Sequence, residues 1–244
     1  VRVEVRIAGS WFYNKKKRGR LIWVTAGMAC MAAGCCAAFY MQVSLRAPTE
    51  VREAMAMDES AKKVAITFDD GPNPDYTEML LAGLKERGVN ATFFLLGKEV
   101  EQYPEIVKKI HEGGHLIGTH SYEHVNLSNL TDAAAIEQVD KTNAAIHDIT
   151  GKYPEYIRPP YGCWKCNLDY ETKMIEVLWD VDPKDWATDN SGVIAKRVID
   201  KVEENDIILL HDASESSVKA AFAIIDELEK EGYTFVTVEE ILME

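Results

Sequence analysis

Cysteine is scarce in this chain of 244 residues, which has five in all. Three of them, Cys30, Cys35 and Cys36, fall within one apolar segment, where they are most simply small apolar residues. The other two, Cys163 and Cys166, form a single C-x-x-C pair, which does not supply all the ligands of a structural zinc site. We expect these two as free thiols, with a disulfide as the alternative in an oxidising compartment.

Basic residues are also few where a nucleic acid would need them. Residues 47–244 carry nineteen Lys/Arg against thirty-nine Asp/Glu, a net charge of −20, whereas residues 1–46 carry eight Lys/Arg and one Glu, a net charge of +7. The sum is the formal charge of −13 of the whole chain. The large acidic part has no cluster of cations to meet phosphates, which argues against a nucleic acid partner.

The N-terminal cations stand before a long apolar run. The cluster K-K-K-R-G-R ends at Arg20, and residues 21–45 contain no charge, a length that spans a bilayer. Because the cations precede this run, we expect residues 1–20 in the cytoplasm and the rest of the protein outside the cell membrane. We predict a single-pass signal anchor, because the run is longer than a cleaved signal of about 7–15 apolar residues. The alternatives are a cleaved, secreted form and a lipid anchor at Cys35; all three place the main domain outside.

The rest of the chain divides into a linker, residues 46–62, and one domain, residues 63–244, without internal repeats. Strand-like apolar runs alternate with amphipathic helical patterns, and this predicts an α/β fold with a parallel sheet, open or closed into a barrel. Thr131 and Ser191 are the expected N-caps of two helices. The strand-like runs are residues 63–68, 91–96, 115–119, 155–158, 174–179, 206–210 and 233–238, and the helical patterns are residues 75–87, 99–112, 131–149, 191–204 and 215–231.

Polar residues gather where the predicted strands end. The carboxyl ends of parallel strands build the site in barrels and doubly wound sheets, so this arrangement predicts a functional site at that edge. The residues in question are Asp69 and Asp70 after the first run, His120 after the third, Arg158 to Gly162 after the fourth, Asp180, Asp182, Asp185 and Trp186 after the fifth, and His211 and Asp212 after the sixth.

An acidic pair and a histidine pair point to a metal. Adjacent carboxylates such as Asp69 and Asp70 are costly to bury unless a cation neutralises one of them. His120 and His124 would face one point if their segment were helical. Each pair alone also occurs as an ordinary turn or a surface pair. Together, two His and one Asp provide three protein ligands with an open position, which predicts a metal-dependent hydrolase holding Zn²⁺, with Co²⁺ or Ni²⁺ as alternatives.

Five motifs carry a resemblance to a known family. They resemble, in order and spacing, those of the NodB-homology polysaccharide deacetylases, carbohydrate esterase family 4, over about residues 61–244. The resemblance implies a distorted (β/α) barrel of seven or eight parallel strands and metal-dependent hydrolysis of N-acetyl or O-acetyl groups on a polysaccharide. The motifs are T-F-D-D-G (67–71), H-S-x-x-H (120–124), R-P-P-Y-G (158–162), D-x-x-D-W (182–186) and L-L-H-D (209–212).

The resemblance also implies roles for the acidic and histidine pairs. It makes Asp70, His120 and His124 the metal ligands. Asp69 would then be the general base that accepts a proton from water, and Arg158 would pair with Asp69. An amide is a poor electrophile, so its hydrolysis requires activation. A bound metal provides this by polarising the acetyl carbonyl and lowering the pKa of water.

The remaining roles follow the same resemblance. The backbone N–H of Tyr161 would bind the oxyanion, and Trp186 and Leu209 would line the pocket for the acetyl group. An amine does not leave as an anion, so a protonated His211 would act as the general acid. Asp185 would orient the His211 imidazole and favour its protonated form.

We therefore expect an enzyme that removes N-acetyl groups from GlcNAc-type residues of a cell-envelope polysaccharide, with peptidoglycan as the first candidate and chitin oligomers as a related one. The enzymatic alternative is de-O-acetylation of xylan or another glycan. The alternative from another class is a catalytically silent glycan-binding domain. The complete set of acidic and imidazole groups argues against that last reading, because a binding domain does not need them all.

Overall fold

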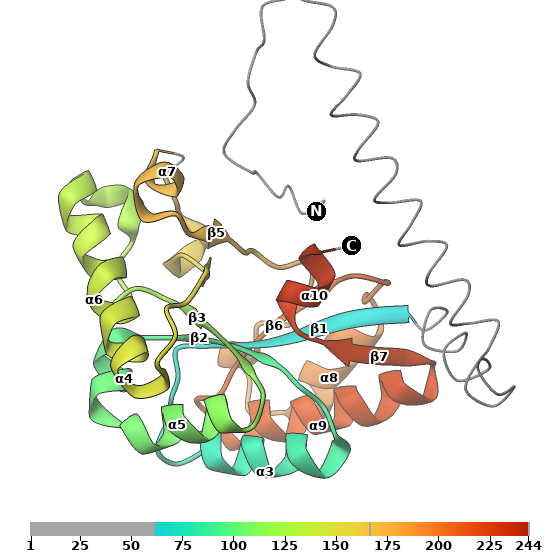
Figure 1. The fold of residues 1–244 in the computed structure, drawn as a ribbon. Coiled ribbons are helices and arrows are strands. Elements are labelled where there is room, and N and C mark those ends of the chain that lie inside the picture. The colour runs from blue at the N-terminus through green and yellow to red at the C-terminus, as the bar shows by residue number, and fades with distance from the viewer. Residues whose placement is uncertain (1–61, 166, 244) are drawn as a thin grey trace, which may run out of the picture. The chain divides into compact units, whose positions relative to one another are not determined.

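The structure, a computed structural model, describes residues 62–165 and 167–243 (Figure 1). The anchor predicted for residues 21–45 lies outside this part of the chain, as does Cys166, so the predictions for the anchor and for the C-x-x-C pair stay predictions. Within the described residues, no helix combines the length and the apolar character needed to cross a bilayer.

A curled parallel sheet forms the centre of the described domain. Its strands follow the order β5-β4-β3-β2-β1-β6, and β7 pairs with the first half of β1. This confirms the predicted α/β class with parallel strands. The strands are β1 Lys62–Asp69, β2 Thr92–Leu95, β3 Leu116–Thr119, β4 Tyr156–Ile157, β5 Ile175–Glu176, β6 Ile207–His211 and β7 Tyr233–Val236.

The strand β1 is the axis of this sheet. After its first two residues every side chain of β1 is buried, which explains its nearly unbroken apolar sequence. Ile66 and Phe68 face the main core, whereas Ala65 packs in a second cluster on the other side of the sheet. The sheet curls back on itself through an irregular segment, since Val181 forms a parallel bridge with Ile208 of β6.

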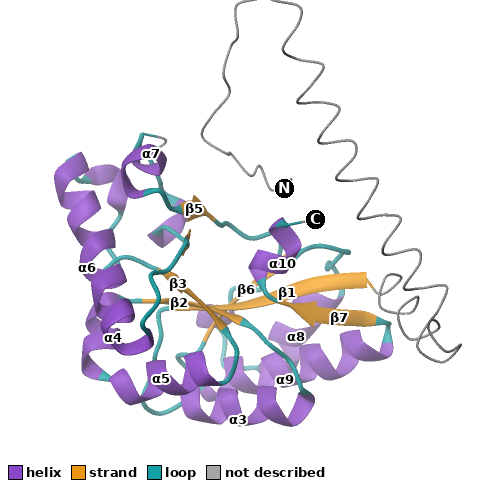
Figure 2. Ribbon diagram, in the orientation of Figure 1, coloured by secondary structure: helices purple, strands orange, loops and turns teal. Residues whose placement is uncertain are grey.

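The helices cover the outside of the curled sheet. Figure 2 shows α3, α5 and α9 side by side beneath it, with the main apolar core between these helices and the strands. The α-helices are α3 Thr77–Arg87, α4 Gly97–Gln102, α5 Pro104–Glu112, α6 Asp132–Thr150, α7 Leu168–Thr172, α8 Ser191–Ile199, α9 Glu215–Lys230 and α10 Val238–Leu242, and the 3₁₀ turns are η1 Leu127–Asn129, η2 Pro160–Gly162 and η3 Asp185–Ala187.

Several helix boundaries differ from the sequence prediction; α8, for example, ends at Ile199, whereas the pattern predicted a helix to residue 204. The pattern at residues 99–112 is two helices, α4 and α5, because Pro104 begins α5 and disfavours helical backbone in the residue before it. Thr131 caps α6 as predicted. The predicted cap Ser191 is wrong by one position: the side chain of Asn190 accepts the backbone N–H of Val193, and Ser191 is the first helical residue.

Candidate active site

The carboxyl ends of the strands surround a cavity of about 790 Å³. Asp69 ends β1 and His211 ends β6, and the two residues are paired in register across the sheet. Of the residues to which the resemblance assigns roles, only Arg158 does not line this cavity; its side chain lies fully buried in the domain. The others all do, namely Asp69, Asp70, His120, His124, Tyr161, Asp185, Trp186, Leu209 and His211. Asp180 and Asp212, which also follow strand ends, do not line it.

The two adjacent aspartates have different environments. Asp69 is 3% exposed, and its Oδ1 forms an ion pair with Nη1 of Arg158 at 2.8 Å. Asp70 has left-handed backbone, with φ of 73°, and its carboxylate faces the histidines instead. Non-glycine residues adopt such backbone at a cost of about 1–3 kcal/mol, and functional sites are where this strain concentrates.

Three predicted metal ligands converge on one point. Nε2 of His120 and Nε2 of His124 each lie 3.4 Å from Oδ1 of Asp70, and the ligand atoms of the three residues all lie within 4.8 Å of one another. That Asp70 oxygen is buried and accepts no hydrogen bond in the described part of the molecule. A buried acceptor without a partner is costly, and a cation at this point would satisfy it. The donor set therefore fits a divalent metal.

His120 is prepared as a neutral ligand. Its Nδ1 is 2.6 Å from the carbonyl oxygen of Arg158, so Nδ1 carries the hydrogen and the lone pair of Nε2 faces Asp70. Burial lowers the pKa of His120, against the opposing charges of Asp69 and Asp70. A metal ligand must be an unprotonated imidazole, and the burial of this ring favours that form.

The rings of His120 and His124 face the same point although their segment is not a helix, which differs from the helical geometry that the sequence suggested. Residues 120–124 form a turn in which Ser121 and His124 have left-handed backbone, with φ of 68° and 56°. Oε1 of Gln138, from α6, accepts the backbone N–H groups of Tyr122 and Glu123 at 3.1 and 2.9 Å. A residue of a separate helix therefore supports the turn, and no local motif indicated it.

Arg158 is buried behind the cavity wall and holds Asp69 in place. Its Nη1 donates to Oδ1 of Asp69 and, at 2.6 Å, to Oγ1 of Thr67, while Nη2 donates to the carbonyl oxygen of Leu178 at 2.9 Å. The guanidinium also lies 4.2 Å from the centroid of the Phe94 ring. Burial lowers the pKa of Arg158, and the Asp69 charge opposes this. A buried cation with this many partners holds the carboxylate of Asp69 in one position.

His211 lies across the cavity from the metal ligands. Its Nδ1 is 2.8 Å from Oδ1 of Asp185, and Oδ2 of Asp185 accepts the backbone N–H of His211 and the hydroxyl of Ser217. Burial lowers the pKa of His211, but the hydrogen bond and charge of Asp185, helped by Asp69 and Asp70, raise it overall to about 9. This imidazole therefore carries a proton at neutral pH, as a general acid requires.

The entrance to the cavity is aromatic. Tyr161 and Trp186 are 66% and 69% exposed, far more than the core aromatics, whereas Leu209 is buried in the wall. Tyr161 has left-handed backbone, with φ of 62°, and its ring meets that of His124 at a centroid distance of 4.8 Å. Exposed aromatic faces beside a polar site suit a carbohydrate, which packs its apolar face on rings.

Besides Gln138, two further supporting residues were absent from the sequence prediction. Ser217, at the start of α9, holds Asp185, and Thr77, at the start of α3, donates to the buried carboxylate of Asp212. Both come from helices that follow a site loop in the chain. Neither belongs to a motif, so only packing identifies them.

Known proteins are similar to this chain in sequence and in fold. Residues 56–177 match the family model described as polysaccharide deacetylase. The chain is 40% identical over 185 residues to the peptidoglycan-N-acetylmuramic acid deacetylase PdaC of Bacillus subtilis, covering 76% of this chain and 40% of that protein. It is 36% identical over 189 residues to a peptidoglycan-N-acetylglucosamine deacetylase of Bacillus cereus, covering 74% of this chain and 88% of that protein.

The solved structure of PdaC from Bacillus subtilis superposes with a TM-score of 0.73 at 40% identity, covering 75% of this chain and 91% of that one. The peptidoglycan-N-acetylglucosamine deacetylase PgdA of Listeria monocytogenes is 36% identical over 202 residues, covering 83% of this chain and 42% of that protein. The chain thus spans about two fifths of the full length of PdaC and of PgdA.

Proposed function

This chain belongs to the polysaccharide deacetylase family, carbohydrate esterase family 4, and from that premise we propose that it hydrolyses N-acetyl groups of peptidoglycan. The observation that carries the proposal is that one cavity holds a metal-ligand set on one side and, on the other, a histidine hydrogen-bonded to a buried carboxylate. The names of the relatives include both N-acetylglucosamine and N-acetylmuramic acid deacetylases, which supports peptidoglycan as the substrate. We take the N-acetylglucosamine residue as the first candidate.

Asp70, His120 and His124 would hold the divalent metal, with Zn²⁺ as the first candidate and Co²⁺ or Ni²⁺ as alternatives. When bound, the metal would supply a Lewis acid that polarises the acetyl carbonyl and acidifies a water molecule. Asp69 stands beside this point, since its Oδ2 is 3.8 Å from Nε2 of His120. In the proposed reaction Asp69 takes a proton from the attacking water, and Arg158 keeps the carboxylate oriented.

The other side of the cavity would complete the reaction. The backbone N–H of Tyr161 would donate to the oxyanion that forms on the carbonyl carbon. His211, oriented by Asp185, would give its proton to the nitrogen as the carbon–nitrogen bond breaks, releasing acetate and a free amine. Leu209 and Trp186 would enclose the methyl of the acetyl group.

We further propose that the domain acts outside the cytoplasm, held at the cell membrane by the anchor of residues 21–45. The basic cluster before that anchor and the extracellular location of peptidoglycan support this placement.

The test is acetate release by the purified chain from peptidoglycan, chitin oligomers and acetylated xylan. Each substrate is assayed after chelation and again after zinc is restored, with an Asp69→Asn variant as the control for metal binding without a base. We expect acetate from peptidoglycan that disappears with the chelator and returns with zinc. Acetate from xylan alone would support O-deacetylation, and bound metal with no acetate from any substrate would support a glycan-binding domain.

A further inference from the structure

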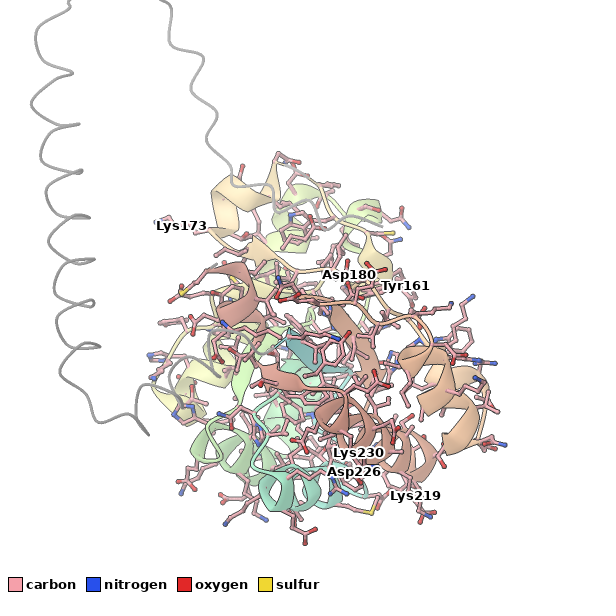
Figure 3. The ribbon with its side chains drawn as sticks, turned by 90° about the vertical axis from the view of Figure 1, so that its right-hand side faces the viewer. Tyr161, Lys173, Asp180, Lys219, Asp226 and Lys230 are labelled. Carbon is pink, nitrogen blue, oxygen red and sulfur yellow. The ribbon has the colours of Figure 1, made fainter. Side chains whose placement is uncertain are left out.

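A second cavity, of about 460 Å³, adjoins the catalytic one. Tyr161, Trp179 and Asp182 line both, so the two cavities lie next to each other. Figure 3 views the molecule from the side on which Tyr161 and Asp180 lie together. A polymer with one sugar in the catalytic cavity would place a neighbouring sugar in this second cavity.

Two lysines line the second cavity, and neither has a partner. Lys184 and Lys201 are exposed, and within the described part of the chain neither forms an ion pair. Other exposed lysines are neutralised by an acidic neighbour, as Lys109 is by Glu78 and Lys196 is by Asp200. Two ammonium groups without an acidic partner at one cavity favour an anion there, although the domain as a whole is acidic.

The acidic residues of the same cavity are engaged in building its wall. Oδ2 of Asp180 accepts the backbone N–H of Ile207 at 3.0 Å, and burial raises the pKa of Asp180. Oδ1 of Asp182 accepts the backbone N–H of Lys184 at 2.7 Å. These carboxylates are therefore occupied by backbone donors and do not pair with the lysine ammonium groups.

The turn that carries Lys184 is braced. Lys184 has left-handed backbone, with φ of 54°, stabilised by the Asp182 hydrogen bond. Nη1 of Arg197, on α8, donates to the carbonyl oxygen of Pro183 at 2.8 Å, which ties the turn to that helix. Lys201 lies just after the end of α8, so the hydrogen bond between Arg197 and Pro183 links the segments that carry the two lysines.

We propose that Lys184 and Lys201 form an anion subsite for a carboxylate on the sugar next to the one that is deacetylated. In peptidoglycan that carboxylate belongs to a muramyl residue, either on its lactyl group or on its peptide stem. Chitin and acetylated xylan carry no carboxylate there, so the subsite would select peptidoglycan over neutral glycans. The inference rests on the proposed deacetylase function and deepens it.

The experiment compares two substrates that differ only in charge. Glycan strands freed of their stems carry lactyl carboxylates, and the same strands after conversion to amides carry none. Acetate release by the zinc-loaded full chain is measured on both, for the wild type and for Lys184→Glu/Lys201→Glu. We expect the double variant to raise KM for the carboxylate strands about tenfold, to leave kcat within about twofold, and to leave the amidated strands unchanged.

A matched control carries the same change of charge elsewhere. Lys152→Glu/Lys173→Glu alters two exposed lysines that line neither cavity and form no ion pair in the described part of the chain, and it should keep the wild-type KM on both substrates. Figure 3 labels Lys173, which lies away from Tyr161 and Asp180. Lys184→Arg/Lys201→Arg keeps both cations and should also keep the wild-type KM. A third substrate with intact peptide stems separates the two sources: a KM effect seen only there would place the bound carboxylate on the stem.

The subsite is overturned if the double glutamate variant keeps the wild-type KM on every carboxylate substrate, both the stem-free strands and the strands with intact peptide stems. This result would leave the deacetylase function standing, since acetate is still released. Absence of acetate from all strands with the wild type would instead overturn the proposed function and, with it, this inference.

Discussion

The two walls of the catalytic cavity use the same side chain, histidine, in opposite states. On the ligand wall (Asp70, His120, His124) burial lowers the pKa of His120 and favours the neutral ring. On the acid wall (Asp185, His211, Ser217) the pKa of the histidine is raised to about 9. Both rings are largely buried, so burial alone does not explain the difference.

The atom that meets Nδ1 separates the two histidines. His120 donates from Nδ1 to a neutral carbonyl oxygen, that of Arg158, whereas His211 donates to the carboxylate of Asp185. A neutral acceptor fixes the tautomer without favouring the cation, while a buried carboxylate favours the cation strongly. The chemical role of each imidazole is thus set by its partner and not by its place at a strand end.

The largest effect should come from the residue between the walls. Asp69→Asn keeps the hydrogen bond from Arg158 but removes the base, so we expect kcat for acetate release to fall about 10²–10⁴-fold. Because the ligand wall is intact, the zinc content of the purified variant, measured by elemental analysis, should equal that of the wild type. Loss of zinc would place Asp69 on the ligand wall, and retained activity would refute its role as the base.

Removing one ligand should affect only the ligand wall. His124→Ala leaves two of three ligands, and we expect zinc affinity to fall by about 100-fold or more. Competition with a fluorescent chelator measures this affinity. His147→Ala is the matched control, since that ring stacks on Tyr153 outside the cavity and should leave zinc affinity unchanged. Equal affinities for both variants would show that the ligand set is wrongly assigned.

The acid wall should respond through pH. Asp185→Asn removes the carboxylate that raises the pKa of His211, so this pKa should fall from about 9 toward its ordinary value of 6.5. A general acid must be protonated, so the fall of kcat/KM with rising pH should begin at a lower pH in the variant than in the wild type. At pH 8 the variant's kcat/KM should be roughly 30-fold below that of the wild type, the ratio of the two protonated fractions. The pH profile of acetate release, with Asp200→Asn as the charge control, checks this.

Stability should follow the same sign. A histidine whose pKa is raised on folding contributes stability that is fully present below its unfolded value of 6.5 and is lost as pH rises through about 9. The free energy of unfolding of the wild type should therefore approach that of Asp185→Asn between pH 6.5 and 9. A constant difference across that window would mean that Asp185 does not raise the pKa of His211.

Periodicity and motif order were sufficient to predict the parallel sheet and the residues that line the cavity. Strand ends are local features, marked by apolar runs followed by polar residues, and parallel strands bring those ends together. The supports were not predictable in this way. Gln138, Thr77 and Ser217 lie on helices, and each meets its partner through tertiary packing that leaves no mark in the nearby sequence.

The backbone conformation of the site could not be predicted from the sequence either. The histidine segment has a helical spacing, but left-handed residues at Ser121 and His124 make it a turn. Polar non-glycine residues seldom adopt this backbone, so local propensity argues against it, and the surrounding structure must impose it. Local rules therefore failed mainly where the site itself is strained.

The smallest predicted effect tests how the buried guanidinium of Arg158 is held in place. Oγ1 of Thr67 accepts from Nη1 of Arg158 and donates to the carbonyl oxygen of Ile208 at 2.7 Å. Oγ1 of Thr119 is equally buried but has no partner among the described residues. Valine matches threonine in shape, so Thr67→Val removes two hydrogen bonds around a buried cation, whereas Thr119→Val removes none.

We expect Thr67→Val to lower the free energy of unfolding by about 1–3 kcal/mol and Thr119→Val to leave it within about 0.5 kcal/mol, both measured by urea denaturation. The Thr67 variant should also lower kcat, because the guanidinium of Arg158, which Thr67 holds, orients the carboxylate of Asp69. If both variants lose the same stability, the hydroxyl does not support the guanidinium, and the pairing of Arg158 with Asp69 is enough to hold that carboxylate in place.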